Sequence, residues 1–317
     1  DFGELELLNR VGSGAYGSVF KARFGSDIVA VKMLHGSPET MREEDYERLL
    51  SDFEAEVQFL SEHRHRNLLM FMGACTKPPK LCIITEFMEK GSLNDMMYRK
   101  ESLTWHQKLN VALQVAYGLG YLHKKGMIHR DIKSHNIFLD SYLNAKVGDF
   151  GLARVKAGMD SKAASMTKMV GSPLWMAPEV IKGERYGMAC DVFSFGILMS
   201  ELWNMKEPYS NVENKSIIPY RVVNEPGFRP QISAEGFSED EQVKEVQERY
   251  LDLMQRCWSA DPEERPDFAI ITDKLSRYER KMRKIERRQE KRARKPSRAR
   301  SRGVNILTKA PSEEGQV

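Results

Sequence analysis

Three side chains that can handle charge are spaced closely enough along the chain to meet in one place. Asp131 ends a His-Arg-Asp tripeptide, Asn136 follows five residues later, and Asp149 opens an Asp-Phe-Gly tripeptide. Residues 128–140 predict a short loop that feeds an apolar strand, and residues 146–148 predict a strand that leads into Asp149. Two strands joined by a turn would bring all three side chains to the mouth of one cleft. We therefore expect charge-handling chemistry there.

A glycine-rich segment near the start of the chain, residues 12–19, indicates a phosphate site. Its pattern, Gly-x-Gly-x-x-Gly-x-Val, lets the backbone approach phosphate closely and leaves N–H groups to donate to the oxygens. A dinucleotide-binding fold would need a helix directly after the glycines, whereas residues 18–23 alternate like a strand. A structural hairpin turn without a ligand remains the alternative for this motif taken alone.

Lys32 ends a short apolar strand, 15 residues after Gly17. On a strand that pairs back beneath the glycine loop, its ammonium would meet phosphate, whereas most strand-borne lysines are simply solvated. An acid on the next predicted helix, residues 39–62, should orient it. Glu56 is preferred because its neighbours in the helical pattern face the core, and Glu54 is the alternative on the opposite face.

The elements that must position these residues change character along the chain. Short alternating or apolar runs come first, and helical periodicity dominates later, which predicts an α+β, bilobal architecture. We expect a small β-rich lobe over about residues 1–86, a hinge over about 86–91 and a larger α-helical lobe over 92–278. The predicted strands lie within residues 4–34, 68–72 and 81–85, and the predicted helices cover 39–62, 105–123, 190–203, 250–258 and 268–278.

Composition places the chain among soluble globular proteins. Of its 317 residues, 41% are hydrophobic and 30% charged, and no apolar run approaches the roughly 20 residues that span a bilayer. The four cysteines form no Cys-x-x-Cys pair, so we expect free thiols in a reducing, cytoplasmic compartment. The chain begins with Asp1 rather than Met, and we expect it to be a fragment of a larger protein.

The positive charge of the chain is concentrated near its C-terminus. Residues 277–302 hold 14 Lys or Arg and three acids, a local net charge of +11, which leaves about −7 for the rest of a chain whose total is +4. Residues 279–317 are expected to form a basic tail, helical at first and then disordered. Such a tail can remain solvated, or it can bind anionic lipid or nucleic acid or direct nuclear import.

Together these motifs resemble a eukaryotic protein kinase catalytic domain over residues 4–278. The resemblance rests on the order and spacing of the glycine loop, Lys32, Glu56, the His-Arg-Asp and Asp-Phe-Gly tripeptides, and an Ala-Pro-Glu tripeptide at 177–179.

The resemblance also extends to two packing motifs of the large lobe. Residues 191–196 are similar to a conserved block of the family, with Phe193 where Trp is usual, a change that affects local packing only. Arg265 is expected to pair with Glu179.

The resemblance implies roles for four catalytic residues. Lys32 would bind the α- and β-phosphates of ATP, and Glu56 would orient it. Asp131 would accept or orient the proton of the substrate hydroxyl. Lys133 would stabilise the transferring phosphoryl group.

The resemblance further implies ATP and Mg²⁺ as ligands. Asn136 and Asp149 would hold two Mg²⁺ ions, whereas the Asp-Phe-Gly at residues 1–3 precedes the glycine loop and is not expected to bind metal. The adenine would bond to backbone between Glu86 and Met88. The ATP-binding residues implied in this way are Val11, Gly12, Gly14, Gly17, Val19, Ala30, Lys32, Thr85, Glu86 and Met88.

The branch of the family can be narrowed by further similarities. Lys133, two residues after the catalytic acid, resembles serine/threonine kinases. Residues 65–75 and 257–262 resemble the tyrosine-kinase-like branch. Residues 148–153 and 171–179 are similar to Raf-like kinases and other members of the kinase-kinase-kinase tier.

The segment from Asp149 to Glu179 is expected to regulate activity. Phosphate on Ser165 or Thr167 would pair with Arg130 and order the loop, although its hydroxyl residues can also serve only to solvate it. Ser172 is expected to line the substrate groove instead.

The function implied is an ATP-dependent serine/threonine protein kinase, Raf-like, in a signalling cascade. Expected partners are protein substrates, including a downstream kinase, and a second kinase domain in a homo- or heterodimer. A dual-specificity or tyrosine kinase of the same branch is the alternative. A pseudokinase scaffold is disfavoured because Lys32, Asp131, Asn136 and Asp149 are all present. A small-molecule phosphotransferase is disfavoured by residues 171–179.

Overall fold

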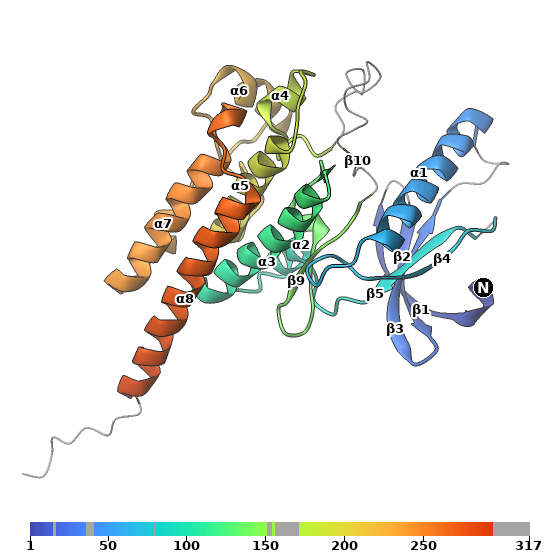
Figure 1. Cartoon of the computed structure of the whole chain (residues 1–317), viewed down its shortest axis with the longest axis horizontal. Helices are drawn as coiled ribbons and strands as arrows, with labels where there is room; N and C mark the ends of the chain where they lie inside the picture. The colour runs from blue at the N-terminus through green and yellow to red at the C-terminus, as the bar shows by residue number, and fades with distance from the viewer. Residues whose placement is uncertain (15–16, 36–40, 79, 151–153, 156–170, 294–317) are drawn as a thin grey trace, which may run out of the picture.

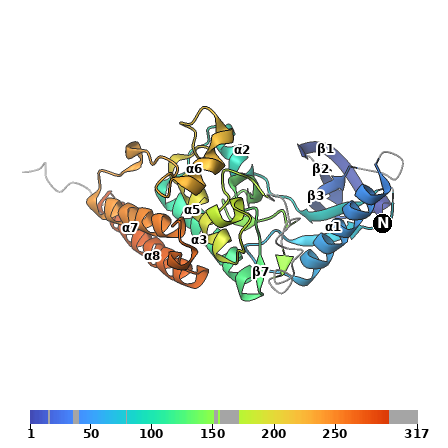
Figure 2. The same cartoon turned by 90° about the horizontal axis from the view of Figure 1, so that it is seen from above.

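The computed structural model describes residues 1–14, 17–35, 41–78, 80–150, 154–155 and 171–293. A β-sheet formed by the first part of the chain lies at one end of the molecule, and a group of helices formed by the later part lies at the other (Figure 1). The same division is visible from above (Figure 2). The predicted α+β, bilobal architecture is confirmed.

The sheet places Lys32 at its centre. In the register of this antiparallel sheet, Lys32 pairs with Val19 on one side and with Ile83 on the other. Val29 and Val31 are fully buried on one face of the sheet, so Lys32 projects from the opposite face. The five strands are β1 (Leu5–Gly14), β2 (Gly17–Phe24), β3 (Asp27–Leu34), β4 (Phe71–Cys75) and β5 (Cys82–Glu86), in the order β1-β2-β3-β5-β4.

Helix α1 (Glu43–Glu62) follows the central strand and packs beside the sheet (Figure 1). Three acids in its first turn complement the positive end of the helix dipole. Its buried side chains, among them Phe53, Glu56 and Phe59, lie at helical spacing. Glu56 therefore faces inward with the apolar side of the helix.

The larger lobe is organised around α5 (Ala189–Asn204), in which every residue from Cys190 to Trp203 is buried. Helices α3 (Trp105–Lys124) and α8 (Phe268–Ala293) lie side by side (Figure 1), and α5 packs against α3 and α7 (Glu241–Cys257). The remaining helices of this lobe are α2 (Leu93–Tyr98), α4 (Pro178–Ile181) and α6 (Ile218–Asn224). Short strands complete it: β6 (Gly91–Ser92), β7 (Met127–Ile128), β8 (Ile137–Leu139), β9 (Ala145–Val147) and β10 (Arg154–Val155).

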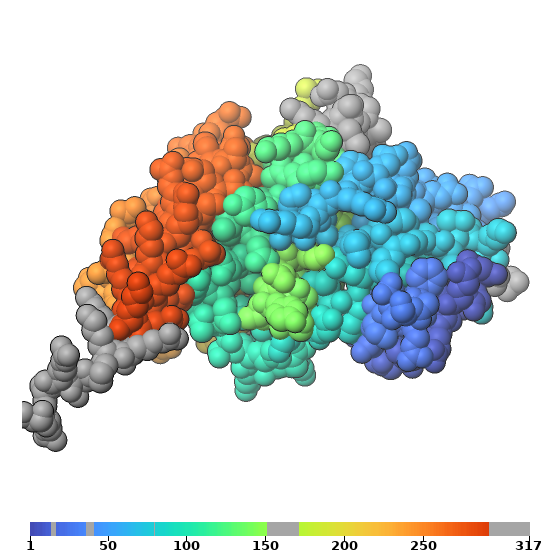
Figure 3. Space-filling model, turned by 60° about the horizontal axis from the view of Figure 1, so that its bottom comes forward, coloured from blue at the N-terminus to red at the C-terminus, as the bar shows by residue number. Residues whose placement is uncertain are grey.

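Helix α7 is longer than its sequence pattern predicts, and α8 extends into the segment that the sequence analysis expected to begin as a helix. Helix α7 begins nine residues before the predicted start, where Asp240 caps its N-terminus by accepting from two backbone N–H groups. Helix α8 continues past Tyr278, and Met282 and Ile285 are buried along one stripe of the extension. The outer face of α8 remains exposed along the end of the molecule that is farthest from the sheet (Figure 3). None of the helices in the described ranges is both long and apolar enough to cross a membrane.

The Asp-Phe-Gly tripeptide at the start of the chain forms part of a short capped helix. The carboxylate of Asp1 accepts the backbone N–H of Gly3 at 3.1 Å and caps a short 3₁₀ helix, Phe2–Glu4. It lies before the first strand.

A buried ion pair ties the end of the Ala-Pro-Glu tripeptide to the C-terminal part of the lobe. The guanidinium of Arg265 donates to both carboxylate oxygens of Glu179, at 2.6 and 2.9 Å, and both residues are buried. The same guanidinium lies 5.1 Å from the ring centre of buried Phe193. Phe193, which stands where Trp is usual in the family, thus packs beside the buried ion pair.

We predict that Arg265→Gln lowers the free energy of unfolding by about 3–5 kcal/mol, because it leaves the carboxylate of Glu179 buried without its partner. Arg277→Gln is the matched control, since Arg277 pairs with Asp273 on the exposed side of α8. Urea denaturation of the variants at neutral pH measures both effects. Equal losses in the two variants would contradict the importance of the buried pair.

Candidate active site

The centre of the candidate site is an ion cluster that spans the two lobes. The ammonium of Lys32 lies 3.2 Å from a carboxylate oxygen of Glu56 on α1 and 3.3 Å from Oδ1 of Asp149 in the Asp-Phe-Gly segment. Of the two acids considered on the helix, the structure thus brings Glu56 to Lys32. The side chain of Asp149 is 46% exposed, which leaves it open to a ligand.

The pKa values of this cluster depend on the balance between burial, which disfavours each charge, and the attraction between Lys32 and the two acids. Burial alone lowers the pKa of Lys32, but Asp149 and Glu56 outweigh it and raise the pKa above its usual value. For Asp149 burial acts to raise the pKa, and Lys32 outweighs it, so the pKa is lowered. For Glu56 burial wins over Lys32 and the pKa is raised. Lys32 therefore stays charged, ready for an anion.

Apolar packing behind Asp149 sets its direction. The ring of Phe150 is buried between Phe59 of α1, at a centroid distance of 4.9 Å, and His129, at 5.3 Å. Asp149 itself adopts a φ of 59°, a region that few residues other than glycine enter. Because Phe150 is held on one side of the chain, Asp149 is turned to the other, towards Lys32.

The catalytic-loop residues predicted from the sequence are brought together as a second polar cluster. The ammonium of Lys133 lies 2.8 Å from Oδ2 of Asp131, and the amide nitrogen of Asn136 donates to the same oxygen at 2.9 Å. The hydroxyl of Ser172 donates to Oδ1 of Asp131 at 2.9 Å and accepts from Lys133 at 2.6 Å. Both carboxylate oxygens of Asp131 are thus engaged and its orientation is fixed.

Hydrogen bonds to Asp191 of α5 fix the loop that carries Asp131. Its fully buried carboxylate accepts the backbone N–H groups of His129 and Arg130, at 2.8 and 2.9 Å, and contacts the ring of His123 at 2.9 Å. Arg130 has a φ of 68°, so the loop turns sharply just before Asp131. Sequence reasoning matched this acid to a conserved block without assigning it a task.

The predicted ATP-contacting residues lie on neighbouring strands of the sheet. In its register Gly12 pairs with Val19, and Ala30 pairs with Thr85. A Cβ atom on Gly17 would lie 2.2 Å from the carbonyl oxygen of Met33, so this glycine is required by close backbone packing whatever it does for phosphate. Val11 and Gly14 lie on β1. Glu86 is the last residue of β5, and Met88 follows it two residues later.

Lys146 is a residue that sequence reasoning missed. Its ammonium lies 2.7 Å from both carboxylate oxygens of Glu86, the last residue of β5, and Glu86 also accepts the backbone N–H of Met70 at 2.6 Å. Lys146 is three residues before Asp149 on β9. One ion pair thus links the predicted adenine-binding segment to the strand that leads into Asp149, the predicted metal-binding acid.

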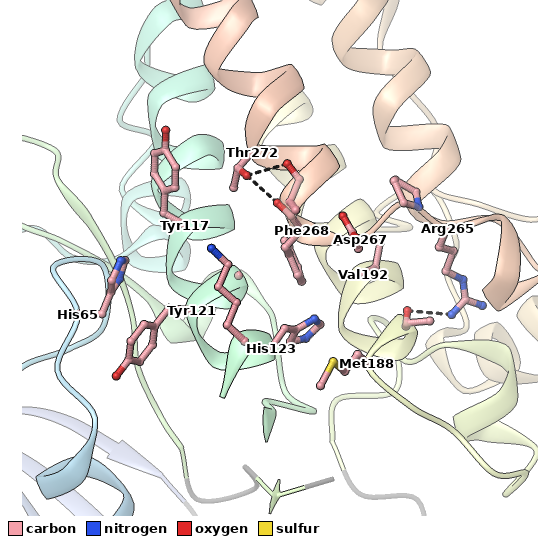
Figure 4. A pocket seen from close by; sticks show the side chains of 15 residues that line it. His65, Tyr117, Tyr121, His123, Met188, Val192, Arg265, Asp267, Phe268 and Thr272 are labelled. Carbon is pink, nitrogen blue, oxygen red and sulfur yellow. Dashed lines mark hydrogen bonds between the residues drawn. The ribbon is translucent and has the colours of Figure 1, made fainter. Parts of the chain in front are cut away.

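A separate cavity lies between α3, α5, the start of α8 and the segment after α1 that carries His65 (Figure 4). It encloses about 500 Å³ and is lined by rings such as Tyr117, Tyr121 and Phe268. None of its lining residues belongs to the predicted ATP-binding or catalytic sets.

Two predicted phosphorylation sites, Ser165 and Thr167, fall outside the residues that the structure describes.

Comparison with known proteins identifies the family. The pattern of the family described as protein tyrosine and serine/threonine kinase matches residues 5–275. This covers most of the chain, and the chain belongs to this family.

Several curated relatives match over most of this chain. A probable serine/threonine-protein kinase of Dictyostelium discoideum is 37% identical over 278 residues, 87% of this chain and 28% of its own length. Serine/threonine-protein kinase STY17 of Arabidopsis thaliana is 36% identical over 92% of this chain and 47% of its own length. Serine/threonine/tyrosine-protein kinase HT1 of the same plant is 35% identical over 88% of this chain and 67% of its own length. The predicted resemblance to Raf-like serine/threonine kinases is confirmed, and the chain spans less than half of the first two relatives.

We predict that Lys146→Met raises the KM for ATP roughly fivefold, an effect of about 1 kcal/mol, because Glu86 loses its charged partner at the hinge. The kcat should change little, since Asp131 and Lys133 are untouched. Steady-state kinetics at varied ATP measure both constants. Lys182→Met, which removes an exposed lysine 3.7 Å from Glu184, is the control. An unchanged KM for ATP in Lys146→Met would refute the role of this pair.

Proposed function

We propose that this chain is the catalytic domain of a Raf-like serine/threonine protein kinase that transfers the γ-phosphoryl group of ATP to hydroxyl groups of proteins. The observation that carries the proposal is the cluster in which Lys32 contacts both Glu56 and Asp149. It joins a lysine suited to phosphate with an exposed acid suited to metal. Asp131 lies in the adjoining loop, in place to receive a substrate hydroxyl.

The residues present fit Mg²⁺ bound together with ATP. No group of three or more His, Cys, Asp or Glu side chains suited to a metal occurs among the described residues. Mg²⁺ in kinases is held by one or two protein oxygens and completed by phosphate and water, which needs no such group. Asp149 has an exposed carboxylate, and Asn136 uses its amide nitrogen on Asp131, so its side-chain oxygen is the atom suited to a cation. Bound there, Mg²⁺ would neutralise phosphate charge.

The other roles in phosphoryl transfer fall to side chains of the catalytic loop and to Lys32. Asp131, oriented by Asn136 and Ser172, would accept or orient the proton of the attacking hydroxyl. Lys133, which contacts Asp131 and Ser172, would place its positive charge beside the transferring phosphoryl group. Lys32 would hold the α- and β-phosphates.

Serine and threonine are the acceptors that the relatives' names favour, and Lys133 supports the same choice. The name of HT1 also includes tyrosine, so dual specificity is the second candidate. Activation through Ser165 or Thr167, a downstream kinase as substrate, dimerisation, contacts of the basic tail with lipid or nucleic acid and a cytoplasmic location remain predictions for the whole protein.

We predict that Lys32→Met and Asp149→Asn each reduce phosphorylation of a generic protein substrate to background without unfolding the chain. Each removes a charge that phosphate or metal would require. Thermal denaturation should show folded variants. Lys32→Arg is the matched control that keeps the charge and changes its position. Near-wild-type phosphorylation by Lys32→Met or Asp149→Asn would overturn the assignment.

We predict that the chain, incubated with Mg-ATP and a degenerate peptide library, phosphorylates Ser and Thr peptides and leaves Tyr peptides at the level of the Asp149→Asn variant. Lys133, beside the acceptor, is typical of serine/threonine kinases. Phosphate incorporation by residue type is the measurement. Comparable incorporation into Tyr peptides would establish the dual-specificity alternative instead.

A further inference from the structure

Two of the four cysteines face each other on neighbouring strands of the smaller lobe. In the antiparallel register Cys75, the last residue of β4, lies directly opposite Cys82, the first residue of β5. Both are free thiols, and the thiol of Cys82 lies within hydrogen-bond reach of the thiol of Cys75. None of the steps of phosphoryl transfer described above uses either of them.

The geometry of this pair matches what a disulfide requires. Directly opposed residues of antiparallel strands have Cα atoms about 4.5–5.5 Å apart, which falls within the span of about 4.4–6.8 Å found across disulfides. Side chains of such a pair also point to the same face of the sheet. A bond between Cys75 and Cys82 would therefore form without a change of register, and β5 would still pair Ile83 with Lys32.

The two thiols lie on the face of the sheet that is turned away from Lys32. Cys82 is fully buried in the apolar cluster that includes Val29 and Val31, and Cys75 packs against the same cluster. Cys75 itself is only partly buried. A small oxidant can thus reach Cys75 from solvent, whereas Cys82 is shielded by the cluster and in contact with Cys75.

We propose that Cys75 and Cys82 are an oxidative modification site, at which a hydroperoxide converts the two thiols into a reversible disulfide that joins β4 to β5. The proposal does not depend on kinase activity. In reducing compartments disulfides are usually transient and serve as redox sensors, so a pair of free thiols that are in contact is the expected resting form of such a site.

The proposed reaction has two steps. The sulfur of Cys75, as the thiolate, attacks one oxygen of the hydroperoxide, which breaks the O–O bond and leaves a sulfenic acid on Cys75. The sulfur of Cys82 then attacks the sulfenic sulfur, the S–S bond forms, and the hydroxyl group leaves as water with the proton of Cys82. With hydrogen peroxide the two thiols lose two electrons in total, and two molecules of water are formed.

The surroundings of the thiols favour this order of events. Burial and the contact with Cys75 raise the pKa of Cys82 to about 12, so Cys82 stays protonated near neutral pH and does not react with peroxide first. Cys190 and Cys257 are buried in the larger lobe, and burial raises the pKa of both. Both should therefore stay reduced under the same conditions, which makes them an internal control.

A disulfide at this position should stabilise the smaller lobe. It closes a loop in which residues 76–81 lie between the two cysteines, and it thereby restricts the unfolded chain. We expect the midpoint of thermal unfolding to be about 3–6 °C higher in the oxidised chain than in the reduced chain.

The test treats the full chain with hydrogen peroxide and then alkylates the remaining thiols after unfolding. Peptide mass spectrometry should find Cys75 linked to Cys82, and thermal denaturation should show the higher midpoint. Cys75→Ala, treated in the same way, is the matched control, because it cannot form the bond and should show no increase. Dithiothreitol reduces disulfides but not methionine sulfoxide, so its removal of the increase separates the disulfide from methionine oxidation.

A second variant gives a readout that does not depend on stability. In Cys82→Ala the sulfenic acid on Cys75 has no thiol opposite it, so Cys75 should proceed to the sulfinic acid, from which wild type is protected. Cys75 recovered as sulfinic acid in wild type, or both thiols still reduced after treatment, would show that the pair serves packing only and would overturn the proposal. Disulfides between separate chains in place of the Cys75–Cys82 link, seen by non-reducing electrophoresis, would contradict it as well.

Discussion

The catalytic loop depends on one carboxylate that the protein buries completely. Asp191 accepts two consecutive backbone N–H groups of the loop, and the contact with His123 outweighs burial and lowers its pKa, so it remains ionised. The loop needs this support because Arg130 adopts a positive φ, a conformation that costs about 1–3 kcal/mol when it is not held in place. With the turn fixed, Asp131 projects from it towards Lys133 and Ser172.

The smaller lobe contributes to the same site through charge and packing together. Lys32 cannot rely on Glu56 alone, because burial raises the pKa of that acid. The contact exists only while α1 lies against the larger lobe, where Phe59 touches the ring of Phe150. Movement of α1 would therefore separate the apolar contact and the ion pair at the same time. This coupling makes the position of one helix decisive for the orientation of Lys32, the predicted phosphate-binding lysine.

Periodicity and spacing predict the elements and the charged residues that carry motifs, and they do so because both signals are local. The inward face of α1 distinguishes Glu56 from Glu54, and alternation along β3 sets Lys32 opposite two buried valines. Contacts between distant residues without a motif stay hidden. Lys146 meets Glu86 across 60 positions, and Ser134 meets Glu201 across 67. A buried acid inside an apolar helical pattern shows that a partner exists, but the sequence does not say which.

Three carboxylates hold segments near the site in place in the same way: those of Glu86, Asp191 and Glu201. Each accepts a backbone N–H from a segment near the site and a further hydrogen bond from a side chain elsewhere. Since an ionised carboxylate has two oxygens and only accepts, one side chain can bind two segments and has no donor of its own to satisfy. Kinase chemistry is carried by loops, which lack the internal hydrogen bonds of helices and strands. Acids on rigid elements replace those bonds and so hold the loops in one geometry.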